Sequence, residues 1–320
     1  MSLNAIDSQT DDPPFQMAPY SPTIGAEVSG IDLGKPMTDG QIMGIRAALL
    51  ERKVLFFRDQ DITTEQHLEF ARNFGELEVH PFAPHKEGYP EILAITHDHE
   101  RPGQENGWHS DVTWRQQPSL GSVLRCIECP PMGGDTLFAD MYAAYDGLPE
   151  VVREKVEGRL ALHDFEGFRV RLRKRGASEA EMEAFNKAYP NPEHPVIRSH
   201  PETGRKGIYV NVAFTKHIIG MAPGESEELL AILYHQANMP EYQCRFRWAA
   251  NSIAFWDNRA CQHYAASDYW PDKRKVERVT VVGDTPYYDA GGPVTDMAES
   301  PFRGRIERQR VEPGPNLFKT

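Results

Sequence analysis

A series of short strand-like segments, separated by turn-forming residues, constrains the fold more than any other feature of this sequence. Many short strands of this kind predict a sandwich or a barrel rather than a doubly wound parallel sheet. The sequence contains neither G-x-G-x-x-G nor G-x-x-x-x-G-K-[ST], so a nucleotide-binding fold has little support. The predicted strands are Val54–Phe57, Glu91–Thr96, Leu120–Ile127, Gly207–Val212, Ser252–Trp256 and Lys275–Val282.

Helical segments are predicted between some of these strands. Residues 39–52 carry Ile42, Ile45, Leu49 and Leu50 at helical spacing. Thr63, followed three residues later by glutamine, forms a capping box that predicts a helix ending near residue 75. Further helices are expected at about 141–148, 150–157 and 225–238. We therefore expect a mixed, mainly β fold with flanking helices.

The composition of the chain indicates its cellular location and excludes some classes of binding partner. The chain has 320 residues, a formal net charge of −12 and 40% hydrophobic residues, which is typical of a globular protein. Its acidity argues against nucleic acid as a partner, since no clustered basic stripe accompanies it. No apolar run is long enough to cross a membrane, and residues 1–16 lack the basic and apolar segments of a secretory signal. We therefore expect a cytoplasmic protein.

Four cysteines include one C-x-x-C pair, Cys126 and Cys129, without the second pair that a structural zinc site would need. The pair follows a strand-like run and precedes two prolines, which is unlike the helix start of a thioredoxin motif. We interpret all four as packing residues in a reducing compartment.

Residues 1–20 and 289–320 are rich in proline, glycine and charge, and we expect them to be tails. No linker-like stretch divides residues 21–288, so a single domain is expected there.

The pattern His-x-Asp/Glu is the first candidate for a metal-binding motif in this sequence. On a strand, residues i and i+2 point to the same side, so such a pair can ligate one metal. With 12 histidines and 47 acidic residues in 320, about two matches are expected by chance, and the sequence holds four. The four are His67-x-Glu69, His85-x-Glu87, His109-x-Asp111 and His200-x-Glu202.

Local context separates these matches. His67 and Glu69 lie within the capped helix, where they point away from each other. His200 and Glu202 are in a turn-like segment that we expect to be exposed, and His85 is also in a turn-like segment but is harder to dismiss. The bulky residues around His109-Ser110-Asp111 suit a strand edge that lines a pocket. An ordinary surface histidine is the alternative.

A facial triad of two histidines and one carboxylate needs a second histidine. His263 is the candidate, since it follows the predicted strand 252–256 and a turn, although a buried structural histidine is the alternative. Arg274 and Arg278 follow it in or beside an apolar strand-like run. An arginine inside a strand-built core needs an anion, because an unpaired buried charge is costly.

A set of sequence blocks in the same order resembles the taurine dioxygenase family of iron(II)/2-oxoglutarate-dependent oxygenases, over about residues 18–288. The resemblance implies a double-stranded β-helix (jelly-roll) core with flanking helices, in agreement with the predicted strands. The blocks are Ile24-Gly25-Ala26-Glu27 with Gly30, Phe57-Arg58-Asp59-Gln60, Phe74-Gly75-Glu76-Leu77, Gly133-Gly134-Asp135-Thr136, His163-Asp164-Phe165, His194-Pro195-Val196, Trp256-Asp257-Asn258-Arg259 and Gln262-His263-Tyr264.

The resemblance implies roles for particular residues. His109, Asp111 and His263 would ligate iron(II), and no further catalytic side chain is implied. Thr136 and Arg274 would bind the distal carboxylate of the cosubstrate 2-oxoglutarate, which reacts with O2. The residues implied in binding the primary substrate are Arg278, which would hold its anionic group, with His80 and Phe214.

The sequence departs from the family pattern around the substrate. Ala83 replaces a pocket tyrosine, and Glu105 replaces a pocket asparagine and would pair with a cationic group of the substrate if it faces the pocket. Phe168 and Arg169 replace a serine–phenylalanine pair, at the start of a basic run, Arg169–Arg175, that we interpret as a solvated mobile loop. Taurine itself is therefore in doubt.

We expect a dioxygenase that hydroxylates a small anionic substrate, with an alkylsulfonate and sulfite release first. An alkyl sulfate ester, an aryloxyalkanoate or another carboxylate is the alternative within the family. A metal-binding jelly-roll protein without oxygenase activity, or a zinc hydrolase with the same triad, is the alternative from another class. Members of the family commonly self-associate, so a homo-oligomer is also considered.

Overall fold

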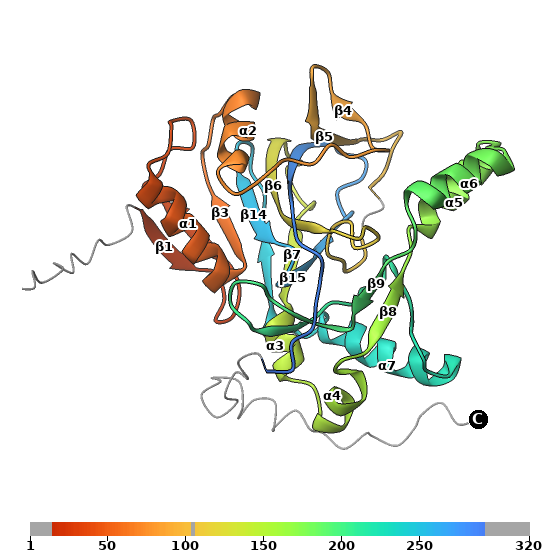
Figure 1. Cartoon of the computed structure of the whole chain (residues 1–320). Coiled ribbons are helices and arrows are strands. Elements are labelled where there is room, and N and C mark those ends of the chain that lie inside the picture. Colours follow the sequence, from red (N-terminus) through yellow and green to blue (C-terminus); the bar gives the residue numbers. More distant parts are fainter. Residues whose placement is uncertain (1–14, 104–105, 292–320) are drawn as a thin grey trace, which may run out of the picture.

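The computed structural model describes residues 15–103 and 106–291. The described residues form one large mixed sheet, three smaller antiparallel sheets and helices that flank them (Figure 1). In the large sheet every neighbouring pair is antiparallel except β2 and β3. Its strand order is β1 (Gln16–Pro19), β2 (Ala26–Ser29), β3 (Val54–Phe57), β14 (Ile253–Asp257), β6 (Ser119–Glu128), β16 (Arg274–Val282), β5 (Tyr89–His97) and β4 (His85–Lys86).

The three smaller sheets contain the remaining strands of the described residues. The first has the order β13 (Gln243–Phe246), β7 (Thr136–Asp140) and β15 (Cys261–Ala265). The second has the order β12 (Thr215–Ile218), β8 (Leu160–His163) and β9 (Glu193–Pro195), and the third pairs β10 (Ile197–Ser199) with β11 (Lys206–Ile208).

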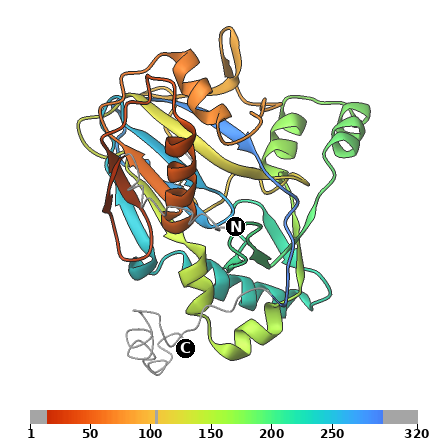
Figure 2. The same cartoon turned by 60° about the vertical axis from the view of Figure 1, so that its left-hand side comes forward.

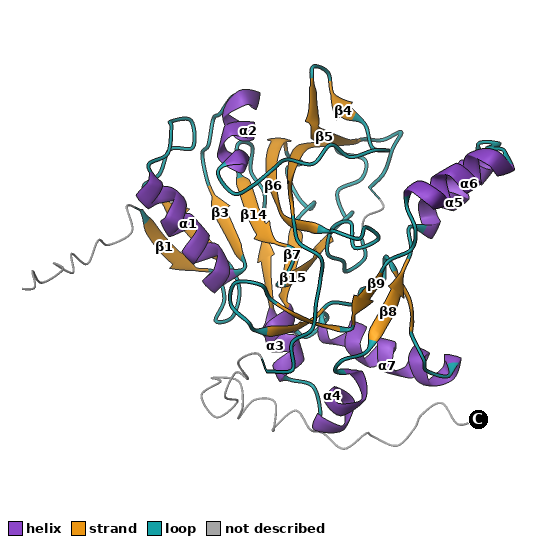
Figure 3. Cartoon of the chain, viewed as in Figure 1, coloured by secondary structure: helices purple, strands orange, loops and turns teal. Residues whose placement is uncertain are grey.

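Helices cover the outer face of the large sheet and the far end of the molecule (Figures 1 and 3). In Figure 2, α1 crosses in front of that face. The helices are α1 (Asp39–Arg52), α2 (Thr64–Arg72), α3 (Met141–Asp146), α4 (Glu150–Val156), α5 (Glu166–Lys174), α6 (Glu179–Ala188), α7 (Pro223–Gln236) and the 3-10 helix η1 (Pro240–Tyr242).

The alternation of side chains along the buried strands explains the layers. In β3, Leu55 and Phe57 belong to a core cluster with residues of α1 and α2, whereas Val54 and Phe56 belong to a cluster with residues of β7 and β13. Phe56 stacks on Phe246 of β13 at a ring-centroid distance of 4.1 Å. The large sheet and the β13–β7–β15 sheet therefore pack against each other through an apolar layer.

The predicted mixed fold of sheets and flanking helices is confirmed. Helix α1 and strand β3 have the predicted bounds, and the capping box of α2 is present, with Gln66 N donating to Thr63 Oγ1 at 3.3 Å. Three details were wrong: α2 ends at Arg72, the strand predicted at 207–212 is limited to β11, and β1 lies within the segment expected to be an N-terminal tail. No helix in residues 15–103 and 106–291 combines the length and apolar character that a membrane crossing requires.

The largest correction concerns residues 169–175, which were expected to be a mobile loop: residues 169–174 belong to α5, and Arg175 is its C-cap. Arg169 is buried, and it donates from Nε to Asn186 Oδ1 at 2.8 Å and from Nη2 to Tyr189 O at 3.0 Å. These partners come from α6 and its C-terminus, an element that the sequence did not lead us to expect. The contacts of Arg169 therefore anchor this helix on α6.

Candidate active site

His109 and His263 lie opposite each other across an isolated antiparallel bridge, although they are far apart in the sequence. Their backbones exchange two hydrogen bonds, His109 N to His263 O at 3.0 Å and His263 N to His109 O at 2.8 Å. Residues directly opposite each other in an antiparallel pair project to the same side, and the two imidazole rings are 4.2 Å apart between centroids. The bridge thus brings the two predicted histidine ligands together.

Asp111 completes the group, but from a turn rather than from the strand edge that we predicted. The chain turns at Val112, which has a φ of 51°. Asp111 Oδ1 is 3.9 Å from His109 Nε2 and 3.8 Å from His263 Nε2. Potential ligand atoms of the three side chains all lie within 4.8 Å of one another, the only such cluster among the described residues.

Hydrogen bonds orient the Asp111 carboxylate. Ser122 Oγ donates to Asp111 Oδ2 at 2.8 Å, and Arg278 Nη1 donates to Oδ1 at 2.5 Å. Asn258 accepts from Asp111 N at 3.2 Å and is itself held by Trp256 Nε1 at 2.9 Å. Burial, the largest single effect, would raise the pKa of Asp111. Arg278, His263, His109 and the Ser122 hydrogen bond together outweigh burial and hold this pKa well below its usual range. The carboxylate is therefore charged at neutral pH.

The two histidines are suited to offer neutral nitrogen ligands. His109 Nδ1 lies 2.7 Å from Gly107 O, and because a carbonyl only accepts, Nδ1 carries the proton and Nε2 is left with a lone pair. Burial, followed by the neighbouring His109, lowers the pKa of His263 to about 3. Metal-binding histidines must be unprotonated at the ligand atom.

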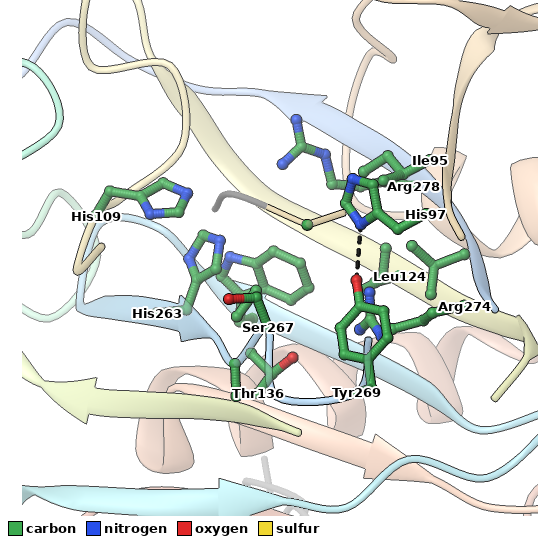
Figure 4. A pocket seen from close by; sticks show the side chains of 15 residues that line it. Ile95, His97, His109, Leu124, Thr136, His263, Ser267, Tyr269, Arg274 and Arg278 are labelled. Carbon is green, nitrogen blue, oxygen red and sulfur yellow. Dashed lines mark hydrogen bonds between the residues drawn. The ribbon is translucent and has the colours of Figure 1, made fainter. Parts of the chain in front are cut away.

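A cavity lined by Thr136 and Arg274 lies beside the two histidines, and in Figure 4 Arg274 is on the side opposite His109. Arg274, Val276 and Arg278 occupy positions i, i+2 and i+4 of β16, so their side chains share one face of the strand and line the cavity. Arg274 is only 6% exposed. Its Nε and Nη2 have no hydrogen-bond partner among the described residues. Such a buried cation needs an anionic partner.

Aromatic residues that we did not predict hold this end of the cavity. Trp248 Nε1 donates to Thr136 Oγ1 at 2.9 Å, which leaves the threonine hydroxyl free to donate to another group. The Arg274 guanidinium carbon lies 5.8 Å from the Trp248 ring and 6.0 Å from the Tyr269 ring, and Tyr269 OH lies 2.8 Å from His97 Nδ1. No motif or spacing in the sequence connects these aromatics with Arg274.

A larger cleft of about 680 Å³ adjoins this cavity, and both are lined by His109 and Arg278. The predicted substrate residues His80 and Phe214 line the cleft, as does Ala83. His80 Nδ1 accepts from Phe82 N at 3.2 Å and from Ala83 N at 3.1 Å, and burial, followed by Arg278, lowers the pKa of His80 to about 4. Glu105 lies outside the described residues.

The other His-x-acid pairs do not form a comparable site. His67 is completely buried in α2, whereas Glu69 is exposed. His200 was expected in an exposed turn, and that expectation was wrong because His200 is fully buried with Nε2 3.1 Å from Asp257 Oδ2. Glu202 forms ion pairs with arginines, including Arg259 at 2.8 Å. His200 and Asp257 are therefore buried, and Arg259 links Asp257 to Glu202 in the exposed turn, a connection that sequence alone did not reveal.

Comparisons with known proteins agree with this arrangement. The chain matches the family described as "Taurine catabolism dioxygenase TauD, TfdA family" over residues 16–280. It is 37% identical to an alpha-ketoglutarate-dependent sulfate ester dioxygenase of Pseudomonas putida, covering 84% of this chain and 89% of that protein. It is 34% identical to an (S)-phenoxypropionate/alpha-ketoglutarate-dioxygenase of Sphingobium herbicidovorans, covering 85% and 96%.

A solved structure is also similar to this one. The crystal structure of a taurine dioxygenase from Burkholderia xenovorans superimposes with a TM-score of 0.75 at 38% identity. The similarity covers 87% of this chain and 93% of that one.

Proposed function

The chain belongs to the TauD/TfdA family and is an alpha-ketoglutarate-dependent dioxygenase, and from this premise we propose that it hydroxylates a small organic anion. An alkylsulfonate is the leading substrate class, with a sulfate ester next and an aryloxyalkanoate after it. Hydroxylation of the carbon that bears the sulfonate or sulfate would release sulfite or sulfate and leave an aldehyde. The observation that carries the proposal is the buried guanidinium of Arg274, whose Nε and Nη2 lack a hydrogen-bond partner among the described residues, in the cavity beside the two-histidine, one-carboxylate cluster.

His109, Asp111 and His263 would hold iron(II), because two neutral imidazoles and one carboxylate are the donor set of non-haem iron(II) oxygenases. The bound iron would supply the oxidation, in which O2 and 2-oxoglutarate are consumed and succinate and carbon dioxide are formed. The chain contributes charge neutralisation and orientation: Gly107 fixes the tautomer of His109, and Ser122 fixes the rotation of the Asp111 carboxylate.

Arg274 and Thr136 would bind the distal carboxylate of 2-oxoglutarate. A guanidinium binds a carboxylate through charged hydrogen bonds, and each is worth roughly 1.5–3 kcal/mol. The Thr136 hydroxyl would donate a further hydrogen bond, since its oxygen already accepts from Trp248.

The substrate anion would lie in the larger cleft, near Arg278, His80 and Phe214. Arg278 already contacts Asp111, so the same residue would position a metal ligand and attract the substrate. Its Nε has no hydrogen-bond partner in the described part of the chain and is buried, which leaves a donor for an anion. Glu105 lies outside the described residues, and we propose that it would pair with a cationic group of the substrate.

The proposal extends to the fold and the location. The large sheet packed on the β13–β7–β15 sheet supports a double-stranded β-helix core in one domain, which begins before residue 21 because β1 belongs to the large sheet. The four cysteines are free thiols, which fits the cytoplasmic location that we propose. A homo-oligomer stays a prediction, which sedimentation analysis would test.

The cosubstrate half of the proposal is tested spectroscopically. Anaerobic addition of iron(II) and 2-oxoglutarate to the protein is expected to give a weak visible charge-transfer band. Arg274→Ala should need much more 2-oxoglutarate to reach the same band while metal binding persists. Lys275→Ala is the control, because Lys275 follows Arg274 in β16 and projects to the other face. A folded, iron-loaded protein without the band would contradict the assignment.

The substrate half is tested by a panel of sulfonates, sulfate esters and carboxylates, scored for stimulation of succinate formation. Because Arg278 also contacts Asp111, the assays use saturating iron(II); under that condition Arg278→Ala should keep uncoupled succinate formation but lose coupled oxidation of the substrate. Identical behaviour of Arg274→Ala and Arg278→Ala would contradict the separate roles proposed for the two arginines.

A further inference from the structure

One face of α5 forms the outer wall of the larger cleft. Phe168, Arg171, Leu172 and Arg175 line the cleft and occupy positions i, i+3, i+4 and i+7, which form a single stripe along a helix. Arg173 and Lys174 lie outside that stripe and do not line the cleft. The basic segment of the sequence therefore divides into arginines that face the cleft and basic residues that face elsewhere.

Aromatic contacts hold α5 against the cleft. Phe168 stacks on Phe82 at a centroid distance of 4.1 Å, and Phe165 stacks on Trp114 at 4.8 Å. Phe165 also contacts Phe214, whose ring is 5.8 Å away and packs near His109. The wall that carries the arginines is thus continuous with the residues beside the candidate metal ligands.

A buried arginine secures the other side of the helix. Arg169 forms an ion pair with Asp164 and hydrogen bonds to residues of α6 and its C-terminus. Helices α5 and α6 lie together at one side of the molecule in Figures 1 and 3. The positions of Arg171 and Arg175 at the cleft are therefore set by packing as well as by helix geometry.

The charges that line the cleft contrast with the rest of the chain. The chain has a formal net charge of −12. Among the described residues, however, the charged side chains of the cleft are the four arginines Arg101, Arg171, Arg175 and Arg278 and the carboxylate of Asp111. Arg278 pairs with Asp111, whereas Arg171 and Arg175 form no ion pair within the described residues. Arg101, Arg171 and Arg175 are thus three exposed cations of the cleft without an ion-pair partner among the described residues, and two of them belong to the α5 stripe.

We infer that Arg171 and Arg175 form a second anion-binding subsite, which selects elongated substrates carrying an anionic group at each end. One anion would lie near Arg278 by the metal ligands, and the second would lie between Arg171 and Arg175. The apolar body of the substrate would contact the wall formed by Phe82, Phe168 and Leu172. This inference rests on the proposed function, since it specifies the substrate class of the same cleft.

The test compares alkane-α,ω-disulfonates with alkane monosulfonates over a graded series of chain lengths. Binding to the iron-loaded protein with 2-oxoglutarate, under anaerobic conditions, is measured by calorimetry and so does not depend on turnover. The wild-type protein should prefer the disulfonate at one range of lengths. In the double variant R171Q/R175Q, the ratio of disulfonate to monosulfonate affinity should fall about tenfold. Raising the salt concentration should reduce the wild-type preference, because exposed charges are screened.

The matched control is R173Q/K174Q, which removes the same charge from the same helix outside the cleft-facing stripe. This variant should keep the wild-type ratio of affinities. The inference is overturned if the wild-type protein shows no preference for disulfonates at any length. It is also overturned if both double variants change the ratio equally, which would indicate a general electrostatic effect. Stimulation of succinate formation by monosulfonates tests the proposed function separately, so failure of the two claims can be distinguished.

Discussion

Trp248 contacts both residues that we propose to bind the distal carboxylate of 2-oxoglutarate. Its indole N–H donates to Thr136 Oγ1, and its ring lies 5.8 Å from the Arg274 guanidinium carbon. The first contact determines the direction in which the threonine hydroxyl can donate, and the second provides a cation–π surface behind the arginine. We therefore propose that Trp248 is a positioning residue, which would act on the cosubstrate through Thr136 and Arg274.

Replacing Trp248 with phenylalanine separates these two contacts, because the ring surface is largely kept and the N–H is lost. Loss of one neutral hydrogen bond, worth about 1 kcal/mol, should raise the KM for 2-oxoglutarate about fivefold. Affinity for the metal in the absence of 2-oxoglutarate should stay at the wild-type value. Cosubstrate titrations followed by the charge-transfer band would measure the effect. The control is Trp270→Phe, at a residue that is 62% exposed, and an equal change in both variants would contradict the role of Trp248.

Ser122 has a comparable role toward Asp111, the proposed metal ligand, since it donates to the carboxylate oxygen farther from the histidines. Groups that orient metal ligands typically contribute 10- to 100-fold to metal affinity. Ser122→Ala should therefore weaken iron(II) binding by about 10- to 100-fold, as measured by metal titration under anaerobic conditions. Ser199→Ala, at a buried serine in β10, is the control. Unchanged metal affinity in Ser122→Ala would mean that Arg278 and Asn258 suffice to orient the carboxylate.

Local sequence signals predicted those elements whose ends are specified by nearby residues. The bounds of α1 follow from its apolar spacing and from Thr38 and Gln41, which form a reciprocal capping box. Likewise, β16 was predicted from its apolar run, and its alternation places Arg274 and Arg278 on one face. These features depend on residues within a few positions of each other, so the sequence contains the required information.

Features that depend on distant partners could not be derived in this way. His109 and His263 face each other because of a bridge between segments far apart in the chain, and no spacing rule leads to it. His200 is buried beside Asp257, and the basic run lies in α5, where Arg169 binds residues of α6. The family resemblance suggested the first pairing, whereas nothing in the sequence suggested the other two.

The α5–α6 pair offers a direct test of this dependence on distant contacts. Arg169→Leu would leave the Asp164 carboxylate without its ion-pair partner and would remove the hydrogen bonds to Asn186 and Tyr189. Losing hydrogen bonds to a charged group should lower the free energy of local opening by about 2 kcal/mol. Amide hydrogen exchange should speed up across residues 166–188 and stay unchanged in the large sheet. Arg173→Leu on the same helix is the control, and equal exchange in both variants would contradict the anchoring role.

Buried neutral histidines link the stability of the whole molecule to pH. His67, His163 and His194 are completely buried and lie in different parts of the fold, in α2, β8 and β9. Burial is the largest cause in each case: it lowers the pKa of His67 and of His194 to about 4 and that of His163 well below its usual value. Arg125 and Lys86 lower the pKa of His67 further.

These shifts determine the sign of the pH dependence. Between about pH 6.5 and pH 4, a histidine of the unfolded chain binds a proton that buried His67 does not, so protons favour unfolding. The free energy of unfolding should therefore fall with decreasing pH in this window, by up to about 1.4 kcal/mol per pH unit for each such histidine. Urea unfolding at a series of pH values measures this slope. His67→Leu should reduce this slope by about 1.4 kcal/mol per pH unit, which corresponds to one proton. The variant also loses the contact with Val123 O, which lowers its stability at neutral pH without changing the slope. His99→Gln, at an exposed histidine, should leave the slope unchanged. An unaltered slope in His67→Leu would show that other groups control the acid sensitivity of the fold.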